Sequence, residues 1–136
     1  MMGIGRIRGE IVDIKEKYYK GFEGEPEIEI VNEGEKVLRI WNGYFETLLE
    51  SLFNEEDPVG LIKEYVFHEG WYDESPWEIK DLDLAIEQFK KSDINNIRHK
   101  EEIQNILPIL PELSREIVSF LQDSKEKGKK VYIVYE

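Results

Sequence analysis

The sequence predicts an α+β (or α/β) fold: a single small mixed sheet, with antiparallel strands near the N-terminus, a helix followed by a strand at the C-terminus, and helices packed on the sheet. Residues 27–31 alternate charged and apolar side chains, which is the period of a half-buried strand. Residues 131–135 are continuously apolar, as in a strand covered on both faces. A chain of 136 residues, 40% of them hydrophobic, can build one core, and we expect a single domain over residues 1–136.

The first half of the chain is expected to hold three strands and one helix. These are strands at residues 4–14, 27–31 and 36–41, a Gly- and Glu-rich connection at 18–26, a turn at 32–35, and a helix at about 43–53. The second and third strands predict a hairpin with Glu27 and Glu29 on its solvent-exposed face. Asn42 is expected to cap the helix, because its side chain can accept a hydrogen bond from a free backbone N–H. The residues on one face of this helix are Tyr44, Leu48, Leu49 and Leu52.

Shorter elements are expected in the middle of the chain. These are a helix at about 57–65, a polar and aromatic loop at 68–75, a strand at 77–79, a helix from 81 or 83 to 91, a loop at 92–99, and one or two helical turns at 101–107. Asp57 followed by Pro58 is typical of a helix start. Val66 and Phe67 fit either that helix or a strand. Pro108 is expected to end the helical turns.

The last helix and strand give the clearest pattern. Pro111 begins a helix whose apolar residues Leu113, Ile117, Phe120 and Leu121 recur at helical spacing. Lys125 and Lys127 complement the negative end of the helix dipole, and Gly128 ends the helix. A strand over residues 129–136 is expected to follow.

The charge of the chain restricts its partners. Thirty Asp and Glu against eighteen Lys and Arg give a formal net charge of −12 at pH 7. This charge repels phosphates, so we expect no nucleic-acid ligand and favour a basic protein as the partner. The absence of cysteine excludes disulfides and Cys-based zinc sites. Residues 1–14 lack the apolar run of a signal peptide, and no stretch reaches the ~18 apolar residues of a membrane span. We therefore expect a cytoplasmic monomer or weak dimer that binds no membrane.

Acidic residues recur beside aromatic ones in two segments. The candidate partner-binding residues there are Trp41, Tyr44, Glu46, Glu50, Trp71, Tyr72, Asp73 and Glu74. Trp and Tyr are enriched in binding hot spots, and acidic neighbours steer a basic partner. The pattern also has structural interpretations. Trp71 and Trp77 fit a loop packed into the core equally well, and Glu46 and Glu50 fit a solvated helix face.

No motif predicts catalysis, a cofactor or a metal. With thirty acids, any carboxylate pair can be selected for acid–base chemistry, so such a pair is not specific. His68 and His99 lack the spacing of metal ligands, and the acidic stretches lack the glycine register of an EF-hand. We therefore expect a protein that is not an enzyme and that has no catalytic residue, cofactor or metal.

Two stretches of the chain carry a family resemblance. Residues 44–52 place acids four apart between leucines, just after the aromatic–glycine approach at 41–43. Residues 114–136 combine Glu116-Ile117-Val118, Phe120, Lys125 and Gly128 with a closing apolar strand, and residues 77–79 and 87–89 match a middle strand and short helix in order. About half of the chain thus resembles the barstar family of small acidic ribonuclease inhibitors, and more broadly the immunity proteins of bacterial toxin systems.

This resemblance implies an inhibitor whose carboxylates plug the cationic active site of a nuclease. The matching positions are Glu46 and Glu50, where the family has Asp, and Asp123 on the last helix. The chain departs from the family in two places. A strand pair before Asn42 stands where the first helix is expected, and residues 54–75 form an insertion.

We therefore expect an immunity or inhibitor protein that occludes the basic active site of a toxin, most of all a nuclease. Three alternatives stay open. A DNA mimic would carry carboxylates in a long double row, a small enzyme would hold one acid with a raised pKa in a pocket, and an adaptor domain would show neither feature.

Overall fold

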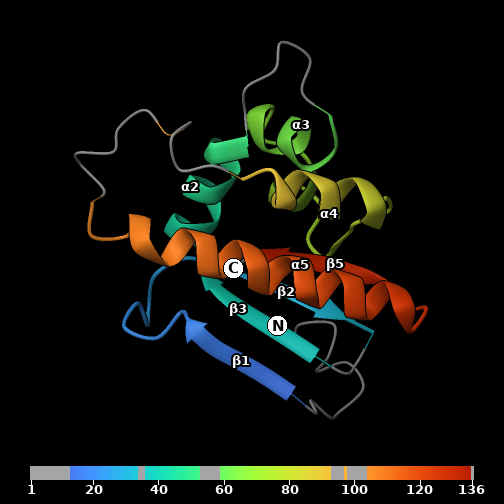
Figure 1. Ribbon diagram of the computed structural model, residues 1–136, viewed down its shortest axis with the longest axis horizontal. Helices are drawn as coiled ribbons and strands as arrows, with labels where there is room; N and C mark the ends of the chain where they lie inside the picture. Colours follow the sequence, from blue (N-terminus) through green and yellow to red (C-terminus); the bar gives the residue numbers. More distant parts are fainter. Residues whose placement is uncertain (1–12, 34–35, 53–58, 93–96, 98–103, 136) are drawn as a thin grey trace.

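The chain forms a five-stranded sheet with α5 lying across one face (Figure 1). The computed structural model describes residues 13–33, 36–52, 59–92, 97 and 104–135. The strands are β1 (Asp13–Tyr18), β2 (Glu27–Asn32), β3 (Lys36–Trp41), β4 (Trp77–Glu78) and β5 (Val131–Tyr135). The helices are α2 (Asn42–Leu52), α3 (Gly60–Val66), α4 (Leu82–Lys90) and α5 (Leu110–Glu126), with 3₁₀ turns η1 (Gly70–Tyr72) and η4 (Leu107–Ile109).

The sheet is mixed, with the strand order β1-β3-β2-β5-β4. β1 runs parallel to β3, and the other neighbouring strands pair antiparallel. β2 and β3 form the predicted hairpin, and β5 has a hydrogen-bonded neighbour on each side, as its apolar run indicates. The predicted α+β class is confirmed.

The main core lies between the sheet and the helices. β2 and β3 contribute paired residues to it, because Ile28 faces Ile40 and Ile30 faces Leu38 across the ladder. α5 buries residues at helical spacing against them, and α4 packs beside α5 on the side away from β1 (Figure 1). The largest fully buried side chains are Trp71, Tyr18, Phe45 and Phe89.

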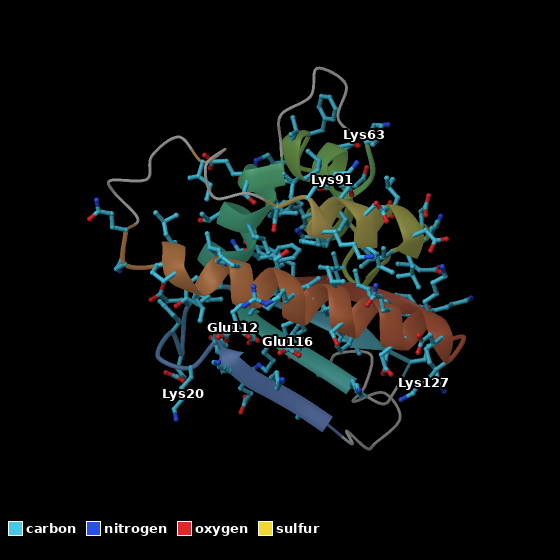
Figure 2. The ribbon with its side chains drawn as sticks, viewed as in Figure 1. Lys20, Lys63, Lys91, Glu112, Glu116 and Lys127 are labelled. Carbon is cyan, nitrogen blue, oxygen red and sulfur yellow. The ribbon has the colours of Figure 1, made fainter. Side chains whose placement is uncertain are left out.

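Ion pairs join α5 to the β1 edge of the sheet. Lys17 lies 2.5 Å from Glu112, and Lys15 lies 3.0 Å from Glu116. Figure 2 shows both glutamates on the side of α5 nearest β1. The Tyr18 hydroxyl also donates to Glu112 over 2.8 Å. The cations of this charged strand therefore serve to hold the helix.

The position of β1 differs from the prediction. β1 covers Asp13–Tyr18, whereas the predicted strand at 4–14 lies outside the described residues except at its last two positions. The sequence of β1, Asp-Ile-Lys-Glu-Lys-Tyr, is mostly charged, so the apolar alternation that identifies a half-buried strand is weak. Charged residues are common on edge strands, where they discourage pairing with other chains.

Two predicted helix boundaries are also wrong. Asn42 does not cap α2: it is the first helical residue, its backbone N–H donates to Pro26 over 3.0 Å, and its buried Oδ1 has no partner in the described part of the chain. Pro108 does not end a helix, because it lies within η4, which leads directly into α5. Proline is tolerated there, since N–H groups in a first turn have no intrahelical acceptor.

Several other predictions hold, and some cannot be compared. Asp81 caps α4 by accepting a hydrogen bond from the Leu84 N–H over 2.9 Å, and Gly128 follows α5 with φ +66°. α3 ends at Val66, so Val66 is helical and Phe67 follows the helix. Asp57 and Pro58 lie outside the described residues, and so do residues 93–96. Residues 98–103 also lie outside them, and this range includes the start of the helical turns predicted at 101–107.

The prediction that Glu27 and Glu29 lie on a solvent-exposed face is wrong. The two residues are only 8% and 1% exposed, and Arg39 lies opposite Glu29 in the β2–β3 register. The guanidinium of Arg39 binds Glu27 through two hydrogen bonds of 2.7 and 2.6 Å, and it lies 3.7 Å from Glu29. It also packs over the Tyr19 ring, 4.7 Å from the ring centroid.

We predict that Arg39→Met lowers the free energy of unfolding by about 3 kcal/mol, because it leaves the Glu27 carboxylate buried without this cation. Urea unfolding followed by circular dichroism measures the change. Lys125→Met is the matched control, since the Lys125–Asp83 pair is largely exposed and exposed pairs contribute about 0.2–1 kcal/mol. Equal losses in the two variants would contradict the role given to Arg39.

Candidate functional site

Helices α2 and α3 lie on the side of the molecule away from β1 (Figure 1), and each contacts the other, while η1 contacts α3. Several carboxylates belong to these three elements and the residues beside them. We call this set the acidic face. Its members are Glu46 and Glu50 of α2, Glu64 of α3, and Glu69, Asp73 and Glu74 around η1. α2 follows β3 without a loop and buries Phe45, Leu48 and Leu49. This leaves the flank of α2 that carries Glu46 and Glu50 partly exposed.

Trp71 fixes the η1 part of the acidic face to the core. Its side chain is fully buried, with ring centroids 5.8 Å from Phe45 and 5.6 Å from Trp77. Gly70, at φ +64°, lets the chain turn at this point. A side chain there would meet Glu64 within about 3 Å, so α3 and η1 approach closely. With Trp71 pointing inward, the neighbouring Glu69, Asp73 and Glu74 remain exposed.

Aromatic rings connect the acidic residues of the different elements. The ring of His68 lies 6.4 Å from Tyr65 and 5.0 Å from Tyr72, and Tyr72 lies 5.2 Å from Tyr135. The Tyr72 hydroxyl donates to the Glu46 carboxylate. Burial and this hydrogen bond raise the pKa of Tyr72 far above its ordinary value, so the phenol stays protonated. Burial, Glu46 and Glu50 likewise raise the pKa of Tyr65.

Among the described residues, no Lys or Arg side chain forms an ion pair with a carboxylate of the acidic face. The ion pairs found in the described part of the chain involve carboxylates elsewhere, on α5, on α4 and around Arg39. Partial burial, together with Glu69 and Glu74, raises the pKa of Glu64, although Lys63 of α3 (Figure 2) opposes the shift. Folding therefore disfavours the ionised form of Glu64 on this acidic face.

The structure brings together some of the sequence-predicted partner residues. Glu46, Glu50, Tyr72, Asp73 and Glu74 share the acidic face. The face also includes residues that the sequence reading missed, namely Glu64, Tyr65 and Glu69. The sequence contained a signal for them, because Glu64 and Tyr65 adjoin like the other acid–aromatic pairs, but nothing in the sequence shows that the helix at 57–65 packs beside α2.

Two other predicted residues, Trp41 and Tyr44, lie elsewhere. Trp41 stacks on Phe22 with ring centroids 4.1 Å apart, and Tyr44 meets the edge of that stack at 5.1 Å from Trp41. The Trp41 indole N–H donates to Glu25 over 3.1 Å. These rings form a second, half-buried cluster at the start of α2.

Trp71 and Asp123 lie outside the acidic face. Trp71 belongs to the core, so the structural interpretation of that tryptophan is the correct one. Asp123 lies near the C-terminal end of α5, 3.1 Å from Lys36 and 3.3 Å from Lys127, and these cations hold its pKa below the ordinary value. Its charge is already balanced there.

The acidic face offers carboxylate and phenol groups, which are chemically suited to contact a cation. Among residues 13–33, 36–52, 59–92, 97 and 104–135, no group of three or more His, Asp or Glu side chains has the arrangement of a metal site. No described helix is long and apolar enough to cross a bilayer. Carboxylates beside half-exposed tyrosines can receive Lys and Arg side chains through charge-assisted hydrogen bonds and cation–π contacts.

Comparison with known proteins identifies no relative of this chain. No family model matches the chain, and no curated protein or solved structure shows significant similarity to it. Functional inference therefore depends on the residues of the acidic face.

We predict that Glu64→Gln raises the free energy of unfolding at pH 7 by about 0.2–1 kcal/mol, the range of exposed charge pairs. The raised pKa of Glu64 means that folding disfavours its ionised form, so the variant's advantage should shrink as the pH falls through that raised pKa. Urea unfolding between pH 7 and pH 4 measures both effects.

Glu87→Gln on the exposed side of α4 is the control for this measurement. A Glu64→Gln variant less stable than wild type at pH 7 would contradict the view that charge on the acidic face opposes folding.

Proposed function

We propose that this protein is an immunity or inhibitor protein that binds and occludes the basic active site of a cognate toxin. The toxin class that we favour is a nuclease. The observation that carries the proposal is the acidic face, a set of neighbouring carboxylates with no ion pair to a described cation. Partial burial, and after it the nearby Glu69 and Glu74, raise the pKa of Glu64, so an external cation near these carboxylates would favour the ionised form.

The physical basis is competition for a phosphate site. A nuclease holds phosphate with Lys and Arg, so a rigid array of carboxylates can occupy the same cleft. Opposed charges also accelerate encounter, to roughly 10⁸–10⁹ M⁻¹s⁻¹ at low salt. Such speed suits an inhibitor that must bind a toxin before it acts.

The resemblance to the barstar family supports part of the same surface. Two of the three acids that the resemblance implies, Glu46 and Glu50, lie on the acidic face. The third, Asp123, is paired with Lys36 and Lys127. We therefore place the contact on α2, α3 and η1 and leave Asp123 out of it.

Identification of the partner is the first experiment. The full chain is immobilised, lysate of its native host is passed over it, and bound proteins are eluted in a salt gradient and identified by mass spectrometry. The captured protein is then expressed alone and together with this chain. A basic nuclease that is toxic alone and harmless in co-expression is the expected result. A set of DNA-binding enzymes would instead support a DNA mimic, and a non-toxic partner would contradict the inhibitor proposal.

We predict that Glu50→Lys combined with Glu69→Lys slows association with the captured toxin by at least about tenfold at low salt and reduces the dependence of the rate on salt. These two carboxylates make no side-chain hydrogen bond among the described contacts, whereas Glu46 accepts one from Tyr72. Stopped-flow fluorescence at several salt concentrations measures the association rate.

The matched control is Glu87→Lys combined with Glu126→Lys, which changes the net charge equally at exposed positions on α4 and α5. If both double variants slow association by the same factor, net charge alone is responsible and the acidic face is not the contact.

A further inference from the structure

Two apolar side chains are exposed next to the acidic face, at the end of α3. Phe67 is 58% exposed and Val66 is 39% exposed. Burial of phenylalanine and valine side chains is favourable, and these two remain exposed in the folded chain. They lie between Glu64 and Glu69 in the sequence, so exposed apolar residues and carboxylates follow one another along this segment.

The backbone that carries Phe67 is held by hydrogen bonds on both sides. The Phe67 N–H donates to the Lys63 carbonyl over 3.1 Å, and the Glu69 N–H donates to the Glu64 carbonyl over 2.8 Å. Between them, His68 takes a left-handed conformation with φ 53°, and its ring lies near those of Tyr65 and Tyr72. The fully buried Trp71 comes three residues after His68. Phe67 is therefore presented by a fixed turn, which lowers the entropy lost on binding.

We propose that Phe67, with Val66 beside it, is the apolar anchor of the interface, and that the partner is a basic protein with an apolar pocket bordered by Lys and Arg side chains. The proposal rests on the proposed function and names the residues that would supply its binding energy. Interface hot spots are commonly such desolvated aromatic anchors, while surrounding charges govern encounter and register.

Charge complementarity selects this occupant over the alternatives. A second copy of the chain would bring the same carboxylates face to face, and like-charge juxtaposition opposes that contact. An anionic membrane surface would repel Glu64 and Glu69 in the same way. A positively charged rim pairs with these carboxylates and lets the pocket cover Phe67.

The test compares Phe67→Ala with Val59→Ala against the basic partner isolated by capture, by surface plasmon resonance. Val59 is the matched control, because it is 47% exposed at the opposite end of α3. Phe67→Ala should raise Kd by at least about 30-fold, mostly through faster dissociation, with the salt dependence of association unchanged. Phe67→Leu should recover part of the affinity, and Val59→Ala should change Kd by less than about twofold. Circular dichroism verifies that each variant folds.

Photo-crosslinking provides an independent measurement. A benzophenone amino acid replaces Phe67 in one sample and the exposed Gln122 of α5 in another. The anchor proposal expects a crosslink from position 67 alone, to a partner segment that combines apolar with Lys or Arg residues.

The outcomes separate the two proposals. If the Glu50 and Glu69 reversals slow association while Phe67→Ala leaves Kd within twofold and no crosslink forms at 67, the anchor is overturned and the inhibitor proposal stands. If Phe67→Ala weakens a basic partner that proves non-toxic, the anchor stands and the inhibitor proposal falls. A dimer of the chain alone that Phe67→Ala abolishes, seen by sedimentation velocity, would show a second copy on this surface and overturn the anchor.

Discussion

The bidentate pairing of Arg39 with Glu27 is the interaction on which the sheet depends. β2 is the central strand, and its alternation places Glu27 and Glu29 on the face opposite the main core, where both are buried. Carboxylates are tolerated in such a place only with a cation and hydrogen bonds. The register of the hairpin supplies Arg39 directly opposite Glu29, so strand pairing and charge pairing require each other.

The chain has fewer cations than carboxylates, and this difference explains the distribution of charge over the molecule. Eighteen Lys and Arg serve thirty acids, and several of them are committed to the sheet and to the contact of α5 with β1 and β3. The carboxylates around α2, α3 and η1 have no such partners among the described residues. Folding disfavours the ionised form of Glu64, because its carboxylate is partly buried and lies near Glu69 and Glu74, and natural proteins commonly give up stability at functional surfaces.

Elements whose residues follow a single period were predictable from the sequence, namely the β2–β3 hairpin, α5 and β5. Prediction failed where a distant residue decides the outcome. Nothing local to Glu27 reveals that Arg39 will cover it, and β1 carries the charges of a loop because α5 supplies their partners. Prediction of the candidate site succeeded and failed for the same reasons. The acids of α2 were found from their spacing, whereas Glu64 and Phe67 join the site only because Trp71 folds η1 against α3.

The burial of Trp71 and the exposure of Phe67 are two sides of one arrangement. The segment after α3 contains several aromatic residues, and a core of this size accommodates Trp71 by packing it against Phe45 and Trp77. The tight turn at Gly70 that directs Trp71 inward leaves Phe67, three residues earlier, outside the core. Stability alone favours a polar side chain at position 67, because an exposed phenylalanine does not stabilise the fold and increases the risk of aggregation. A partner that covers Phe67 while pairing with Glu64 and Glu69 would remove the exposed apolar surface and the carboxylate repulsion in a single contact.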